Sequence, residues 1–118
     1  MRHMSGKKKL NLRGSHRKAM LRNQAIQLII HGHLTSTKTT IKELQRFAEK
    51  LVTIARSGSD FNARRRLKSL LPYKTEALDK LFNEIGPRYA QRPGGYTRVI
   101  SLGQRPSDTA KIARLSWV

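Results

Sequence analysis

The chain has 118 residues, enough for one domain with a single modest core. Its 25 lysines and arginines outnumber its 7 aspartates and glutamates, and the formal net charge of +18 indicates a polyanionic partner, nucleic acid before a membrane surface. The absence of cysteine excludes disulfides and thiolate metal sites. The most apolar window, residues 19–30, is too interrupted by polar residues to span a bilayer, so we expect a soluble protein without membrane insertion.

Residues 1–14 carry five positive charges and no negative one, and their only large apolar residues besides methionine are Leu10 and Leu12. This composition predicts an extended basic arm, with residues 15–118 forming a single globular domain. The alternative is a solvated tail without function. We favour the arm because no acidic residue precedes Glu43, whereas a surface selected only for solubility mixes both signs.

Two helices are predicted in the first half of the domain. Ser15 suits the N-cap of a helix that ends near His31, with Gly32 after its last turn. Thr40 and Glu43 fit a capping box at the start of the second helix. The apolar residues of that helix recur at helical spacing: Ile41, Leu44, Ala48, Leu51 and Ala55.

Two further helices follow. Gly58 is predicted to end the second helix, Asp60 to cap a third, and Pro72 to stop it. The third helix carries a run of basic residues that is either a solvated face or, by a slight preference, an RNA contact. From Thr75 a fourth helix is predicted, with apolar residues at i, i+3, i+4 and i+7: Leu78, Leu81, Phe82 and Ile85.

The stretch 81–98 is the most unusual part of the sequence. Gly86-Pro87 is predicted to break the fourth helix, and Pro93-Gly94-Gly95 forms a second break. Tyr89 and Tyr96 offer flat faces for stacking, and arginines surround them. The stretch is therefore either an RNA contact loop or a tight connector between a helix and a strand.

Three short segments are β-prone: residues 34–37, 98–102 and 112–118. Together with the helices they predict an α+β fold. The expected architecture is a two-layer α/β domain in which about four helices pack on one face of a small three-stranded mixed sheet.

No residue pattern predicts catalysis. The carboxylates are scattered, and the sequence has no phosphate loop and no nucleophile elbow. His31 and His33 could form a metal pair, but no third ligand is near them and a helix C-terminus favours histidine anyway. We therefore predict no enzymatic activity, no cofactor, no metal and no small-molecule substrate.

RNA is favoured over DNA because a basic arm and arginine-rich irregular loops can follow an uneven folded surface. A free DNA-binding, nucleoid-compacting protein remains the alternative. The residues predicted to contact RNA are Arg2, His3, Lys7, Lys8, Lys9, Arg13, His16, Arg17, Lys18, Arg22, Asn23, Lys38, Arg64, Arg88, Arg92, Gly94, Gly95, Tyr96 and Arg98.

Several motifs together resemble one family over essentially the whole chain: Met1-Arg2-His3, Ser15-His16-Arg17, Arg22-Asn23, Lys42-Glu43-Leu44 after Thr37, and residues 81–99 with Gly-Gly-Tyr-Thr-Arg. That family is the bacterial large-subunit ribosomal protein numbered seventeen. The resemblance implies contact with large-subunit ribosomal RNA and with neighbouring ribosomal proteins. It also implies a structural role in the large ribosomal subunit, in the cytoplasm. The Met-Arg-His start favours a bacterial over an organellar source.

Two positions depart from the family pattern. Leu12 stands where the family more often has a basic residue, so the arm is expected to make one phosphate contact fewer. Ser116-Trp117 replaces a more usual acidic-aliphatic pair, which puts the outer contacts of the last strand in question.

Overall fold

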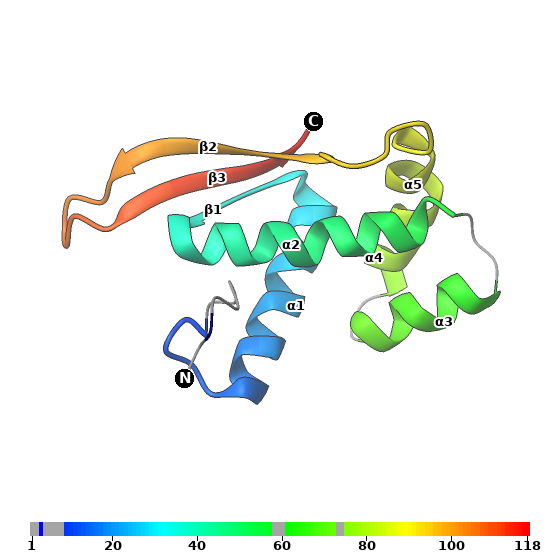
Figure 1. Ribbon diagram of the computed structural model, residues 1–118, viewed down its shortest axis with the longest axis horizontal. Coiled ribbons are helices and arrows are strands. Elements are labelled where there is room, and N and C mark those ends of the chain that lie inside the picture. Colours follow the sequence, from blue (N-terminus) through cyan, green and yellow to red (C-terminus); the bar gives the residue numbers. More distant parts are fainter. Residues whose placement is uncertain (1–2, 4–8, 58–60, 73–74) are drawn as a thin grey trace.

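The computed structural model describes residue 3 and residues 9–57, 61–72 and 75–118. Its three strands lie along one side and helix α2 (Lys38–Ala55) runs beneath them, while helix α1 (Gly14–His31) crosses α2 (Figure 1). The predicted caps Gly58 and Asp60 lie outside the described residues.

The sheet has the order β1-β3-β2, with β1 at His33–Thr37, β2 at Thr97–Gln104 and β3 at Lys111–Trp117. Both pairings are antiparallel, so the predicted mixed sheet is wrong. The reason is the strand order. β1 and β2 run in the same direction, and only as neighbours would they have formed a parallel pair. With β3 between them, that parallel pair does not form.

Helix α1 begins at Gly14, with Arg13 at the N-cap and no side-chain cap, so the predicted cap Ser15 lies inside the helix. At the other end the prediction is confirmed: Gly32 adopts φ 86°, and its N–H donates to the Leu28 carbonyl at 2.8 Å. Just before α1, residues 9–12 form a turn, in which the Leu12 N–H donates to the Lys9 carbonyl at 3.1 Å.

Helix α2 follows β1 without a loop, and Thr37 is both the last residue of the strand and the N-cap of the helix. The predicted capping box is therefore wrong, since Thr40 already lies in the first turn. Its hydroxyl pairs with that of Thr37 at 2.9 Å. The predicted buried stripe of this helix is confirmed in full.

After α3 (Phe61–Leu70) come three helical segments that join one another without a break: α4 (Thr75–Lys80), the π-helix η1 (Leu81–Ile85) and α5 (Gly86–Arg88). The predicted break at Gly86-Pro87 is wrong, because Gly86 has helical dihedral angles. A Cβ on Gly86 would lie 2.9 Å from the Ala55 carbonyl oxygen. Glycine therefore serves close helix packing at this position and does not end a helix.

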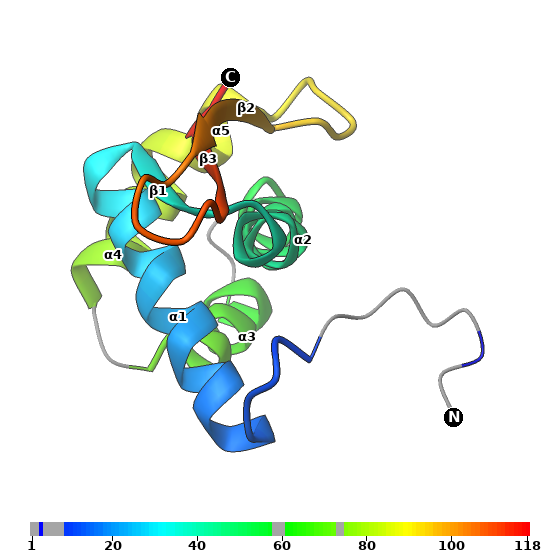
Figure 2. The ribbon, with the colours of Figure 1, turned by 90° about the vertical axis from the view of Figure 1, so that its left-hand side faces the viewer.

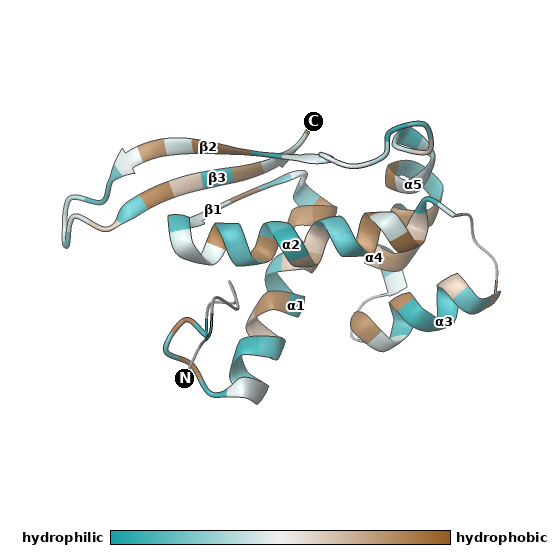
Figure 3. Ribbon diagram, viewed as in Figure 1, coloured by the Kyte–Doolittle hydropathy of each residue, from teal (hydrophilic) through white to brown (hydrophobic). Residues whose placement is uncertain are grey.

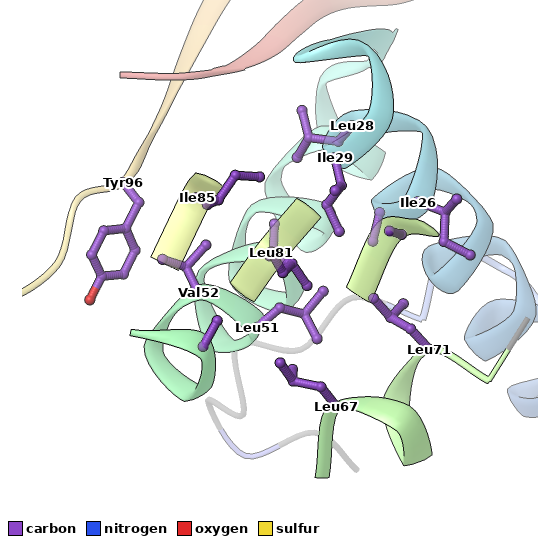
Figure 4. Close-up of a cluster of buried hydrophobic side chains, with 14 of the residues drawn as sticks. Ile26, Leu28, Ile29, Leu51, Val52, Leu67, Leu71, Leu81, Ile85 and Tyr96 are labelled. Atoms are coloured by element: carbon purple, nitrogen blue, oxygen red, sulfur yellow. The ribbon is translucent and has the colours of Figure 1, made fainter. Parts of the chain in front are cut away.

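The core lies between the helices, where the side chains of α2 face those of η1 and α1 (Figure 4). The fully buried side chains include Leu28, Ile29, Leu51, Val52 and Leu81. Figure 3 shows hydrophobic and hydrophilic residues alternating along α2, as expected of a helix with one buried face. Within the described part of the chain, no helix is both long and apolar enough to cross a membrane.

Candidate nucleic-acid interface

A basic stripe runs along the exposed face of α2. Its members stand four residues apart, so they share one side of the helix: Lys38, Lys42, Arg46 and Lys50. At the rise of an α-helix the stripe is about 18 Å long. Lys38 is half-buried and the other three are exposed.

Three hollows follow the basic stripe, and each brings in cations from another part of the chain. The first, of about 560 Å³, adds Lys111 of β3. The second, of about 330 Å³, adds Lys9 and Arg17 from the turn before α1 and from α1 itself. The third, of about 390 Å³, adds Arg65 and Arg66 of α3. Three segments that are far apart in sequence thus add positive charge to that of α2 itself.

Glu43 is the acidic exception among the charged residues that line these three hollows. It lies 3.8 Å from Arg46, and its side chain is 13% exposed whereas that of Arg46 is 63% exposed. The guanidinium therefore faces solvent while the carboxylate is largely covered. The hollows keep a positive potential suited to phosphate groups.

Only some of the residues predicted to contact RNA lie at the basic stripe. Lys9, Arg17 and Lys38 line its hollows. Arg13, His16, Lys18 and Asn23 are exposed, and Arg22 half-buried, around the N-terminal half of α1; His3 is also exposed. Arg2, Lys7 and Lys8 lie outside the described residues.

Sequence reasoning missed most of the basic stripe and its surroundings: Lys42, Arg46, Lys50, Arg65, Arg66 and Lys111. The four-residue spacing of the cations on the side of α2 opposite its apolar residues was a usable signal. The contributions of α3 and β3 had no such signal, because only packing brings those elements beside α2.

The tyrosines of the stretch 81–98 are not available for stacking, contrary to the prediction for Tyr96. Tyr89 is 3% exposed and Tyr96 is 2% exposed, and their ring centroids lie 5.3 Å apart. The Tyr89 hydroxyl donates to the Val118 carbonyl at 2.6 Å, and the Arg56 guanidinium donates to the Tyr96 hydroxyl at 3.3 Å. The rings fill the junction between α5 and the sheet.

The arginines of this stretch point outward instead. Arg88 and Arg92 are exposed, each with its guanidinium 5.9 Å from the centre of the Tyr89 ring. Gly94 and Gly95 have positive φ angles of 145° and 62°. Glycine adopts such angles without steric cost, so the turn accounts for both residues. Arg98 is exposed on β2. This group lies at the opposite end of the molecule from the start of α1 (Figures 1 and 2).

Metal-ligating side chains do not gather in the part of the chain that the structure describes. No three histidine or carboxylate residues there lie close enough to hold an ion. His31 and His33 flank the glycine that ends α1, and their positions are explained by the helix end.

Comparison with known proteins identifies the family of this chain. The family described as Ribosomal protein L17 matches residues 20–118. The Large ribosomal subunit protein bL17 of Gemmatimonas aurantiaca is 45% identical over 118 residues, covering 100% of this chain and 98% of that protein. With a family match over most of its length and a full-length relative at this identity, the chain belongs to the ribosomal protein L17 family.

Proposed function

We propose that this chain is a structural, non-catalytic constituent of the large ribosomal subunit, where it binds and stabilises folded ribosomal RNA in the cytoplasm beside neighbouring ribosomal proteins. The proposal rests on its family and on the printed name of its bacterial relative. The observation that carries the RNA-binding role is the basic stripe of α2, to which the turn before α1, α3 and β3 each add cations.

The mechanism is electrostatic. Folded RNA brings together phosphates that repel each other, and fixed cations at the junction offset that repulsion while counterions are released. Cations on four elements can contact strands that approach from different directions. The exposed Arg88, Arg92 and Arg98 provide a second contact region beside the C-terminal end of α2, where the Arg56 guanidinium donates to the Ala90 carbonyl. The buried tyrosines position this second region and do not touch RNA.

Removal of one charge from the basic stripe tests this role. Lys42→Gln should reduce the slope of log affinity against log salt by roughly 0.7 to 0.9, the value of one lost phosphate contact. The measurement is binding of the full chain to large-subunit ribosomal RNA at several salt concentrations. The control is Arg114→Gln, which removes an exposed charge from the face of β3 opposite to the buried Ala113 and Leu115. Equal slopes for both variants would contradict a contact at the basic stripe.

Sedimentation of cell lysate separates this function from the DNA-binding alternative. Because a ribosomal constituent is held by RNA, the chain should migrate with large subunits after DNase treatment. Migration with the nucleoid, lost on DNase treatment, would instead favour a DNA-compacting role.

A further inference from the structure

A groove between α3 and α4 has an aromatic floor and a basic rim. Phe61, at the start of α3, is 77% exposed, and beside it Leu78 and Phe82 contribute apolar surface to a hollow of about 430 Å³. Phe61 is the most exposed large hydrophobic residue in the part of the chain that the structure describes. It leaves a flat ring accessible to a partner.

Guanidinium groups already lie over both rings of the groove. Arg64 is 4.9 Å from the centre of the Phe82 ring, and Arg65 is 5.7 Å from that of the Phe61 ring. Lys68 completes the basic rim, and Asp79 is the acidic residue of the lining. A partner that suits this groove has a flat polarisable part for the rings and a negative charge for the rim.

The groove is continuous with the basic stripe. Arg65 lines both this groove and the hollow that contains Lys50 and Arg66. An RNA strand that passes along the stripe therefore reaches the groove at Arg65 without leaving a basic surface.

We propose that this groove holds one unpaired nucleotide of the ribosomal RNA, with its base stacked on Phe61 and its phosphate beside Arg65 and Lys68. The inference rests on the proposed function and adds a base-contacting site to it. Planar rings and guanidinium groups favour a base over an aliphatic side chain of a protein. The Asp79 carboxylate can accept a hydrogen bond from an exocyclic amino group, so adenine, cytosine or guanine is preferred to uracil.

The test compares two substitutions of Phe61, which is too exposed for either to disturb the core. Phe61→Leu keeps an apolar side chain but removes the stacking ring, whereas Phe61→Trp keeps the ring. Affinity of the full chain for large-subunit ribosomal RNA should fall by about tenfold in Phe61→Leu, the order expected for one lost base stack, and stay near the wild-type value in Phe61→Trp. Equal affinity of Phe61→Leu and wild type, or an equal loss in both variants, would overturn the stacked base.

A photoreactive benzoylphenylalanine in place of Phe61, carried into assembled large subunits, identifies the occupant. Irradiation should crosslink the chain to ribosomal RNA at a single unpaired nucleotide. A crosslink to a ribosomal protein, or no crosslink, would overturn the inference. The proposed function is judged separately by the wild-type chain. If that chain neither binds the RNA nor enters subunits, the function itself fails, and if it does both, only the nucleotide site is at issue.

Discussion

At the scale of single residues, Gly86 shows how tertiary packing determines a residue type. A Cβ there would stand 2.9 Å from the Ala55 carbonyl oxygen and 3.0 Å from that of Leu81, and neither backbone atom can move aside easily. The glycine therefore allows the end of α2 to approach the helical segment η1–α5.

Gly86→Ala should destabilise the domain by about 1–3 kcal/mol, the usual cost of adding a methyl group to a tightly packed site. The free energy of unfolding in urea measures this. Gly14→Ala is the matched control, because a Cβ at the start of α1 meets only the Arg17 side chain at 4.0 Å. Equal stability of the two variants would show that α2 and α5 can separate without cost.

Tyr89 and Tyr96 also owe their positions to contacts with distant parts of the chain. Their positions in a glycine- and arginine-rich stretch predicted stacking on RNA, yet both rings are buried. The Arg56 guanidinium explains the arrangement, since it donates to the Ala90 carbonyl at 2.9 Å as well as to the Tyr96 hydroxyl. Arg56 lies more than thirty positions away in sequence, so nothing local could reveal that these rings have partners inside the protein.

At the scale of elements, an ion pair holds the turn of the β2–β3 hairpin together. The Arg105 guanidinium donates to both Asp108 carboxylate oxygens, at 3.0 and 2.7 Å, and the Ala110 N–H donates to one of them at 3.2 Å. These bonds lower the pKa of Asp108 to about 2, with the Arg105 hydrogen bond as the largest cause. The charged carboxylate is therefore the form that holds the turn.

The pKa of Asp108 is lower in the folded chain than in the unfolded chain, where an aspartate has a pKa near 3.9. The charged carboxylate therefore stabilises the folded chain at pH values above about 3.9. This stabilisation is lost as the pH falls through about 2. The Asp108 carboxyl carbon followed by NMR should thus titrate near pH 2. In Arg105→Gln its midpoint should rise toward the ordinary value. Arg114→Gln, further along β3, should leave the Asp108 midpoint unchanged. A wild-type midpoint near 3.9 would contradict an ion pair between Arg105 and Asp108.

The junction of α1 and α4 also depends on a contact between elements. The Lys80 ammonium donates to the Ile30 carbonyl at 3.0 Å, in the last turn of α1. Glu76 and Glu84 stand four residues before and after Lys80, at the spacing of helical ion pairs. The ammonium instead satisfies a carbonyl at a helix C-terminus, where a positive charge is also favoured by the helix dipole. This choice depends on where α1 ends in space.

At the scale of the whole molecule, a net charge of +18 on one small domain opposes folding in the absence of RNA. Raising the salt concentration from about 0.1 M to about 1 M shortens the Debye length from roughly 10 Å to roughly 3 Å. The isolated chain should therefore gain stability, about 1 kcal/mol or a few degrees in Tm. Calorimetry of the chain at several salt concentrations checks this.

A variant with Lys18→Glu and Arg66→Glu provides the comparison for this prediction. Both residues are exposed, so the core is unaffected while the excess positive charge falls. Its Tm should depend less on salt than that of the wild type. If the two chains respond equally, self-repulsion is not what limits the stability of the free protein.

By itself the sequence determined the features that arise from local periodicity and composition. The apolar spacing of α2, the Gly32 helix end, the β-prone segments and the excess positive charge could all be predicted, because each depends on residues within a few positions of one another. The motifs from Ser15-His16-Arg17 to the Gly-Gly-Tyr-Thr-Arg segment were also sufficient to identify the family, which the comparison confirmed.

Only the tertiary structure decided what depends on contacts between distant segments. It placed β3 between β1 and β2, it turned the tyrosines inward toward Arg56 and Val118, and it kept Gly86 inside a helix beside Ala55. It also collected cations from three other segments along α2, where the sequence had indicated mainly the arm and the stretch 81–98. The physical reason is the same throughout: burial and charge clustering are set by the neighbours that packing supplies, and those neighbours are far away along the chain.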